Sequence, residues 1–127
     1  MDKRIINSKK APSPVGPYNQ AVMAGNTLYV SGQIAIDQST GELRMEDIEA
    51  ETHQVMQNLS YILEEAGMTF ENVVKCSVFV KDMGMYSRIN NVYASYFQEP
   101  SAPARELVEV ANLPKYVNVE ISCIAIL

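Results

Sequence analysis

Two ionisable side chains, Arg105 and Glu120, lie in neighbouring apolar segments near the end of the chain. Residues 103–110 and 117–124 both alternate as strands do, and a short turn containing Pro114 separates them. A guanidinium can grip a carboxylate through two donors, and a lone carboxylate can direct a water molecule or a proton. If the valine-rich faces of both segments point into the core, Arg105 and Glu120 emerge on the same side of one sheet. The plain alternative is a cross-strand ion pair between them that borders an interface.

The rest of the chain predicts the elements that position these residues. Apolar residues recur at three- and four-residue spacing in two segments, which indicates amphipathic helices, and shorter apolar stretches between turn residues indicate strands. Gly67 and Asp82 are placed to end the first helix and to begin the second. We expect strands at 4–6, 19–23, 27–36, 73–80, 103–110 and 117–124, and helices at 46–66 and 83–97. Two helices suffice to cover one face of a single mixed sheet, so the 127 residues predict one α+β domain.

The second face of that sheet is also expected to be apolar. By alternation it carries Tyr29, Leu107, Ile124 and Ile126. An apolar face without helices on a small α+β sheet indicates burial against other subunits. A site that contains Arg105 would then lie at a subunit interface.

Three further positions have local patterns that suit a site. Residues 11–18 hold three prolines and a glycine, so they form a stiff loop that ends at Tyr18 and either presents a ligand contact or simply crosses the end of the sheet. Gly32 follows Ser31 inside a strand pattern, where glycine often marks a bulge or a close backbone approach. Asn90 lies at the edge of the second helix's apolar stripe, so it faces solvent or a neighbouring subunit.

The amino-acid composition narrows the range of possible functions and binding partners. The net charge is −5 and no run of Lys and Arg is longer than a pair such as Lys9-Lys10, which does not favour nucleic-acid binding. The two cysteines, Cys76 and Cys123, lie in apolar strand patterns and are expected in the core, and the single histidine, His53, is expected on the surface. These residues do not predict a metal site. The N-terminus lacks the apolar region of a signal peptide and no segment has the length of a membrane span, so a cytoplasmic location is expected.

Taken together, the sequence blocks of this chain closely resemble those of the Rid (reactive intermediate deaminase) family, also called YjgF-like proteins. Each block alone is weak, but their order and spacing are specific, and the resemblance covers nearly the whole chain. The blocks are Ala11-Pro12 through Gly16-Pro17-Tyr18, Gln20-Ala21-Val22, Leu28 to Gln33, Asn90 with Tyr93, Pro103-Ala104-Arg105, Val108-Glu109-Val110 and Leu113-Pro114 through Ile121.

The resemblance implies a fold, an assembly and a reaction. The fold is a chorismate-mutase-like α+β fold, with one mixed sheet of about six strands, in a homotrimer with its sites between subunits. The reaction is hydrolysis of 2-imino acids, formed from enamines such as 2-aminoacrylate, to 2-keto acids and ammonia, without a metal or organic cofactor. It implies that Arg105 binds the substrate carboxylate and that Glu120 positions the attacking water. It also implies a pocket lined by Tyr18, Ser31, Gly32 and Asn90.

Two positions depart from the family pattern. Glu106 stands where the family usually has Ser or Thr, and Leu107 stands where it often has Cys. Alternation places Leu107 on the face of Arg105, where it would touch the substrate side chain, whereas Glu106 points away and would compete for Arg105 only if it turned back. The alternative to a deaminase is a trimeric small-carboxylate-binding regulatory or chaperone-like protein with little turnover. Ribonuclease and translation-inhibitor roles suit an acidic chain poorly.

Overall fold

The computed structural model describes residues 2–127, which form an α+β domain. The predicted fold class is confirmed, with two longer helices and six strands in one mixed sheet. The elements are β1 (Lys3–Ile6), β2 (Ala21–Ala24), β3 (Thr27–Gln33), β4 (Ile36–Asp37), β5 (Glu42–Leu43), α1 (Ile48–Glu65), β6 (Val73–Val80), α2 (Tyr86–Ala94), β7 (Ala104–Glu109) and β8 (Val119–Ile126).

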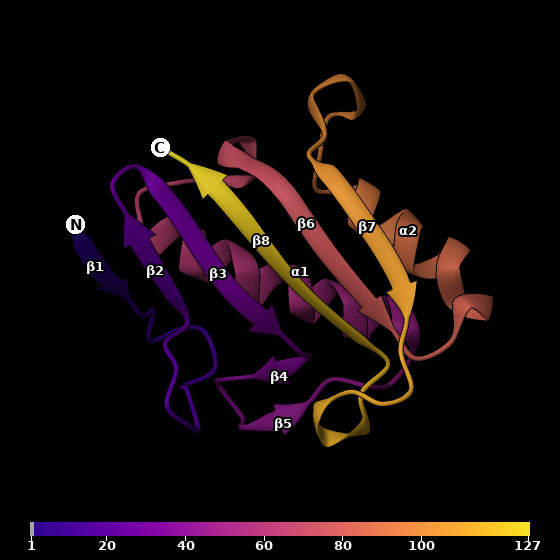
Figure 1. Cartoon of the computed structure of the whole chain (residues 1–127). Coiled ribbons are helices and arrows are strands. Elements are labelled where there is room, and N and C mark those ends of the chain that lie inside the picture. The colour runs from indigo at the N-terminus through magenta and orange to yellow at the C-terminus, as the bar shows by residue number, and fades with distance from the viewer. Residues whose placement is uncertain (1) are drawn as a thin grey trace.

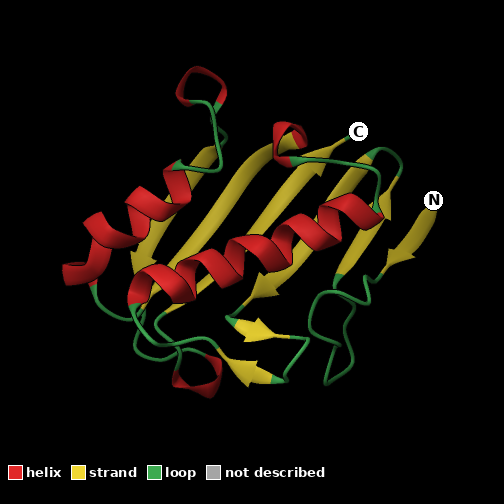
Figure 2. Cartoon of the chain, turned by 180° about the vertical axis from the view of Figure 1, so that it is seen from behind, coloured by secondary structure: helices red, strands yellow, loops and turns green. Residues whose placement is uncertain are grey.

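The six-stranded sheet has the order β1-β2-β3-β8-β6-β7, and both helices lie across one of its faces (Figures 1 and 2). All neighbouring strands are antiparallel except β6 and β7, which are parallel. Parallel neighbours need a crossover connection, and α2 supplies it. A separate two-stranded hairpin, β4–β5, interrupts the segment that alternation had predicted as one strand to residue 36.

Capping residues determine where α1 begins and ends and where the turn before α2 begins. Asp47 begins α1 by accepting a hydrogen bond from the Ala50 amide at 2.7 Å. Gly67 ends it with φ +76°, a conformation that favours glycine, while the Met68 amide donates back to the Leu63 carbonyl. Asp82 accepts from the Gly84 amide at 2.8 Å and starts the short 3₁₀ turn that leads into α2.

The core lies between the helices and the sheet. Both cysteines are in it, as expected, because Cys76 and Cys123 face each other across β6 and β8 and are buried. Burial raises the pKa of Cys76 and of Cys123, so neither thiol is poised to react. His53 is exposed, and its Nδ1 lies 2.9 Å from the Tyr96 hydroxyl.

The structure corrects the predicted side of the sheet for Arg105 and Leu107. Strand β7 pairs with β6 in the register Cys76 to Arg105 and Val78 to Leu107, so both residues lie on the face that the helices cover. The valine-rich side of β7 points the other way, and Val108 is 43% exposed. Because both faces of this sheet are rich in apolar residues, alternation groups the residues correctly but does not tell which group lies beneath the helices.

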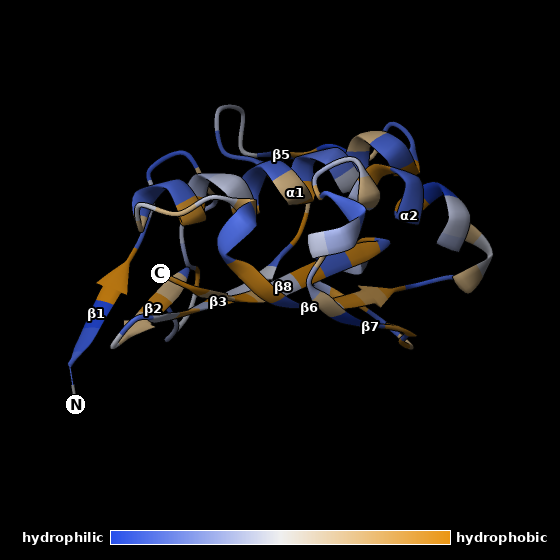
Figure 3. Ribbon diagram, turned by 90° about the horizontal axis from the view of Figure 1, so that it is seen from above, coloured by the Kyte–Doolittle hydropathy of each residue, from blue (hydrophilic) through white to orange (hydrophobic). Residues whose placement is uncertain are grey.

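No helix lies over the opposite face of the sheet in the described part of the chain (Figure 3). Tyr29 and Ile126 are exposed there, as predicted, and Ile124 lies beside Tyr29 on the neighbouring strand. Leu107 was wrongly assigned to this face. Several large apolar side chains therefore border solvent on one uncovered surface: Ile5, Tyr29, Val108 and Ile126.

Candidate functional site

Arg105 is held by side chains from α2. Its Nη1 donates to Asn90 Oδ1 at 2.7 Å, and its Nη2 donates to the Tyr86 hydroxyl at 3.1 Å. Its guanidinium carbon lies 5.0 Å from the centre of the Tyr93 ring and 5.8 Å from that of Tyr86. We call these four residues the arginine cluster. Arg105, Asn90 and Tyr93 also line a cavity of about 660 Å³ together with Phe97.

The position of α2 explains the arginine cluster. Residues 86, 90 and 93 are spaced so that they share one face of a helix, and that face meets the first residues of β7. Two contacts fix the helix: Arg88 pairs with Glu49 of α1 through two bonds of 2.7 Å, and the Met83 amide donates to Glu109 of β7 at 2.8 Å. Asn90 lies beside Arg105 as its hydrogen-bond partner, in a different cavity from Tyr18, Ser31 and Gly32, so its place in one pocket with them stays a prediction.

Tyr86 and Tyr93 show what the helical pattern alone missed. Both belong to the aromatic stripe of α2, which predicted core residues, and Tyr93 is indeed buried. Its hydroxyl has no hydrogen-bond partner among the described residues and lies beside the Cys76 thiol, a weak partner. Burial, and then the neighbouring Cys76, raise the pKa of Tyr93, so this hydroxyl stays protonated beneath the guanidinium.

A second group of predicted residues gathers on the other side of the sheet. Tyr18, Ser31, Gly32 and Glu120, which we call the glutamate cluster, line one cavity of about 440 Å³. The Ser31 hydroxyl donates to the Asn19 carbonyl at 2.7 Å, so it holds the chain beside Tyr18 rather than standing free. The predicted stiff loop therefore does carry Tyr18 to a cavity.

Gln20 anchors this loop; it belongs to one of the family's sequence blocks but was not predicted to have this role. Its side chain is buried, and the amide nitrogen donates to the carbonyl oxygens of Ser8 at 3.0 Å and Pro12 at 2.9 Å. Its Oε1 accepts from the Ser8 amide at 2.6 Å. Because both the oxygen and the nitrogen of this buried carboxamide are hydrogen-bonded, Gln20 fixes the course of the proline-rich segment.

Gly32 is a glycine because the Glu120 side chain crosses it. A Cβ at position 32 would lie 2.9 Å from Cδ of Glu120 and closer still to Oε2. The predicted bulge is also present, because the pairing of β3 with β8 shifts between Val30 and Gln33. Within residues 2–127, the Glu120 carboxylate has no hydrogen bond or ion pair, and desolvation raises its pKa above the usual range. A carboxylate in this state suits proton transfer.

The start of β8 is fixed by a buried carboxylate. Glu51 of α1 accepts from the Asn118 amide nitrogen at 2.7 Å and from Asn118 Nδ2 at 2.8 Å. Just before this point Lys115 and Tyr116 both have left-handed φ values, of 54° and 56°, which are strained for side chains with a Cβ. Glu51 thus holds the end of a strained turn two residues from Glu120.

One chain does not bring the arginine and glutamate clusters together. Arg105 lies opposite Cys76 on the helix-covered face, whereas Glu120 lies opposite Phe79 on the uncovered face. The expectation that they emerge on the same side of one sheet is wrong, and so is the alternative of a cross-strand ion pair within the chain. Each cluster borders a cavity of its own.

The two departures from the family pattern have different environments. Glu106 points to the uncovered face, where Lys75 pairs with it at 3.0 Å and Ser77 donates a hydrogen bond to it. Those two partners, Ser77 first, lower the pKa of Glu106, so its charge is compensated away from Arg105. Leu107 packs against the core and does not line the arginine cavity, so its contact with a substrate stays a prediction.

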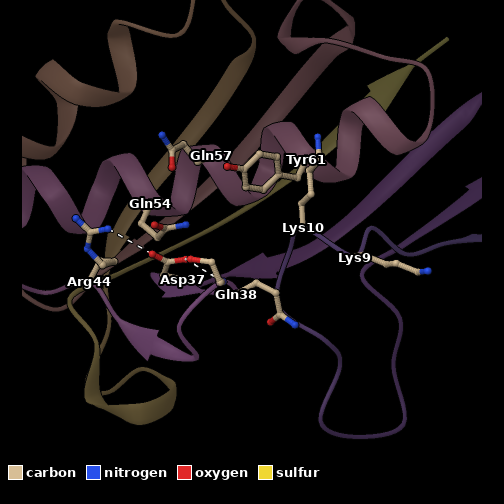
Figure 4. A pocket seen from close by; sticks show the side chains of 9 residues that line it. Lys9, Lys10, Asp37, Gln38, Arg44, Gln54, Gln57 and Tyr61 are labelled. Atoms are coloured by element: carbon tan, nitrogen blue, oxygen red, sulfur yellow. Dashed lines mark hydrogen bonds and ion pairs between the residues drawn. The ribbon is translucent and has the colours of Figure 1, made fainter.

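Another cavity, of about 570 Å³, lies between α1, the β4–β5 turn and Lys9-Lys10 (Figure 4). Three of its four charged groups are paired: Arg44 lies 3.4 Å from Asp37, and Lys10 lies 3.4 Å from Glu64. It contains none of the predicted site residues. Among residues 2–127 no group of three His, Cys, Asp or Glu residues is placed to hold a metal ion. In that range no helix is both long and apolar enough to cross a membrane.

Comparisons with known proteins find relatives along nearly the whole chain and solved structures of the same fold. The family model described as Endoribonuclease L-PSP matches residues 8–127. A RutC family protein of Synechocystis sp. is 50% identical over 128 residues, covering 100% of this chain and 98% of that protein. A 2-iminobutanoate/2-iminopropanoate deaminase of Capra hircus is 44% identical over 124 residues, covering 98% and 90%. The crystal structure of YyfA, a protein of the conserved Rid family from Yersinia pestis, superposes with a TM-score of 0.96 at 44% identity, covering 99% and 100%.

Proposed function

Since the chain belongs to the Rid family, we propose that it is a hydrolytic deaminase that converts reactive 2-imino acids, such as 2-iminopropanoate, to 2-keto acids and ammonia. The observation that carries this proposal is that the Arg105 guanidinium is held by two hydrogen bonds and keeps further donors for a ligand. Asn90 and Tyr86 occupy two of the five N–H donors of its guanidinium, which leaves three for a ligand. A planar fork held in this way is suited to binding a carboxylate through two parallel bonds.

The proposed reaction needs only an anchor and one proton-transfer group. Arg105 holds the substrate carboxylate and so fixes the imine carbon. Glu120 accepts a proton from water as the new O–C bond forms, the electron pair of the C=N bond moves to nitrogen, and Glu120 passes its proton to that nitrogen. In the resulting carbinolamine the hydroxyl proton is transferred through Glu120 to the amine, the C=O bond forms, and the C–N bond breaks to release ammonia. Imines hydrolyse readily, so orientation and one acid–base group can supply the catalysis.

We further propose that the complete site forms between copies of the chain in a homotrimer. Arg105 and Glu120 lie on opposite faces of one sheet, so a single chain does not present both to one small molecule. The uncovered face carries exposed apolar side chains, which favours its burial against another copy. A neighbour packed on that face could bring its arginine cluster to the glutamate cluster. A cytoplasmic location fits this proposal, and neither a cofactor nor a nucleic acid takes part in it.

The direct test generates imino acids in solution with an amino-acid oxidase or a serine/threonine dehydratase, with semicarbazide competing for the imine. Release of the 2-keto acid is followed for small, branched and aromatic substrates. The wild type should accelerate release, while Arg105→Ala and Glu120→Gln should not, although both remain folded trimers. A folded wild-type trimer that accelerates none of these substrates would overturn the proposal.

Mixing the two inactive variants tests the shared site. If each site takes Arg105 from one copy and Glu120 from another, co-refolded Arg105→Ala and Glu120→Gln chains contain sites with both native residues. Random mixing gives about one quarter of such sites, so roughly a quarter of the wild-type activity should return. Sites built within one chain would recover nothing on mixing.

The second candidate is a trimeric protein that binds small carboxylates as a regulator, or acts as a chaperone, with little turnover. The arginine cluster favours a binder, because it is formed without any contribution from Glu120. A pure binder would show a carboxylate-dependent thermal shift that Arg105→Ala removes, and no accelerated keto-acid release. A chaperone would not depend on Arg105 at all.

A further inference from the structure

Tyr86 is the first residue of α2, and its hydroxyl is one of the two side-chain acceptors that hold the Arg105 guanidinium. The contact is polar and not merely apolar packing, since Nη2 of Arg105 donates to it at 3.1 Å. The ring of Tyr86 also lies near the guanidinium, with its centre 5.8 Å from Cζ. Asn90 holds the other terminal nitrogen, so the two acceptors grip the fork at both ends.

We propose that Tyr86 is a positioning residue that sets the orientation of the Arg105 fork for its carboxylate ligand. The identity of that ligand as a 2-imino acid rests on the proposed function, but the positioning does not. With Asn90 alone, the guanidinium could still turn about its bond to that residue. With Tyr86 as well, both terminal nitrogens are held, and the guanidinium plane is fixed with its carbon 5.0 Å from the centre of the Tyr93 ring.

The scaffold around Tyr86 supports this role. Met83, three residues earlier, is tied through its amide to Glu109 on the same strand as Arg105. Arg88, two residues later, is tied to Glu49 on α1 by two bonds of 2.7 Å. The Tyr86 hydroxyl is thus placed by contacts to both the strand and the neighbouring helix. Because the donors of Arg105 are already held in place, less conformational entropy is lost when a ligand binds.

Tyr86→Phe removes only the hydroxyl and keeps the ring, and Tyr96→Phe is a matched control. The Tyr96 hydroxyl also makes a side-chain contact, 2.9 Å from His53 Nδ1, but has no contact with Arg105. Calorimetry with pyruvate, the keto acid expected from 2-iminopropanoate, reports carboxylate binding without turnover. We expect Tyr86→Phe to raise the Kd for pyruvate roughly three- to tenfold, the size of effect typical for the loss of one ordinary hydrogen bond, because the variant weakens the orientation of the fork and removes no contact with the ligand itself. Tyr96→Phe should leave this Kd unchanged.

Two further readouts separate positioning from a general structural effect. In steady-state kinetics Tyr86→Phe should raise KM by the same factor as Kd, with kcat within about twofold of the wild type, because the water-directing group is elsewhere. In an Arg105→Lys background, Tyr86→Phe should have no further effect on Kd, since lysine lacks the fork that the hydroxyl orients.

The outcomes are distinct. A Kd for pyruvate that Tyr86→Phe leaves unchanged, or changes equally in the Arg105→Lys background, would refute the inference. If the wild type binds pyruvate but does not hydrolyse imines, the proposed function fails while the Tyr86 comparison still decides this inference. If Arg105→Ala binds pyruvate as the wild type does, the carboxylate does not use Arg105 and the positioning role falls as well.

Discussion

Replacing Gly32 by alanine should separate activity from stability. A Cβ at this position would meet Glu120 at 2.9 Å from Cδ and 3.0 Å from Cγ, inside the 3.4 Å at which ordinary van der Waals contact begins, and the approach to Oε2 is closer. The carboxylate has to move by about 1 Å or more. A displacement of that size is enough to cost on the order of 100-fold in rate when the group directs a reacting water.

The fold should tolerate the same change. Gly32 does not have a left-handed φ, so alanine is compatible with the backbone there. The Glu120 carboxylate has no bond within residues 2–127 to lose, and its end can turn into the cavity. Alanine also lowers the entropy of the unfolded chain, which stabilises by about 0.4–1 kcal/mol. We therefore expect the free energy of unfolding to stay within about 1 kcal/mol of the wild type.

Keto-acid release with semicarbazide competition measures the activity, and urea unfolding at a fixed protein concentration measures the stability. The decisive comparison is a double-mutant cycle with Glu120→Gln. If alanine acts by displacing the carboxylate, adding Gly32→Ala to Glu120→Gln should cause almost no further loss of activity. Multiplicative losses, or wild-type activity in the single variant, would show that the contact between residue 32 and Glu120 is not what limits the reaction.

Two other predictions concern the half-buried Glu120 and the buried Glu51. Desolvation raises the pKa of Glu120, and the proposed base must be ionised to accept a proton. After subtraction of the uncatalysed rate, kcat/KM should therefore fall as the pH drops through a value above the usual glutamate pKa range. A flat profile of kcat/KM from about pH 4 to 8 would contradict this. Glu51→Ala leaves two Asn118 donors without their acceptor, so it should lower the free energy of unfolding by about 2–4 kcal/mol in urea titrations. Glu51→Gln keeps one acceptor oxygen and should lower it by only about 1 kcal/mol. Equal losses in the two variants would rule out the hydrogen bonds as the cause.

The sequence predicted the elements with strong local signals. The long apolar stripe of α1 and Gly67, which ends this helix, lie within the chain segment itself, and strand β6 alternates clearly from Cys76 to Val80. The β4–β5 hairpin was missed because its strands have two residues each, too short for alternation to show. Gly32 was recognised as a position of close approach, but its partner, Glu120, comes from a distant strand.

The side of the sheet on which Arg105 lies could not be predicted from alternation. That side is set by the register between β6 and β7, which is a tertiary feature. The role of Tyr86 was hidden for a related reason. A tyrosine in an apolar helical stripe is usually part of the core, and only the packing of α2 over the start of β7 brings its hydroxyl to the guanidinium.

The separation of Arg105 from Glu120 has a chemical consequence for the proposed reaction. If both lay on one face within reach, they would form an ion pair that occupies the guanidinium donors and lowers the pKa of the carboxyl. On opposite faces of the sheet neither effect occurs within a chain: Arg105 keeps three donors, and desolvation keeps the pKa of Glu120 raised. In a site shared between copies, the substrate carboxylate would meet Arg105 first, so the cation would be neutralised by the ligand and Glu120 would remain available as the base.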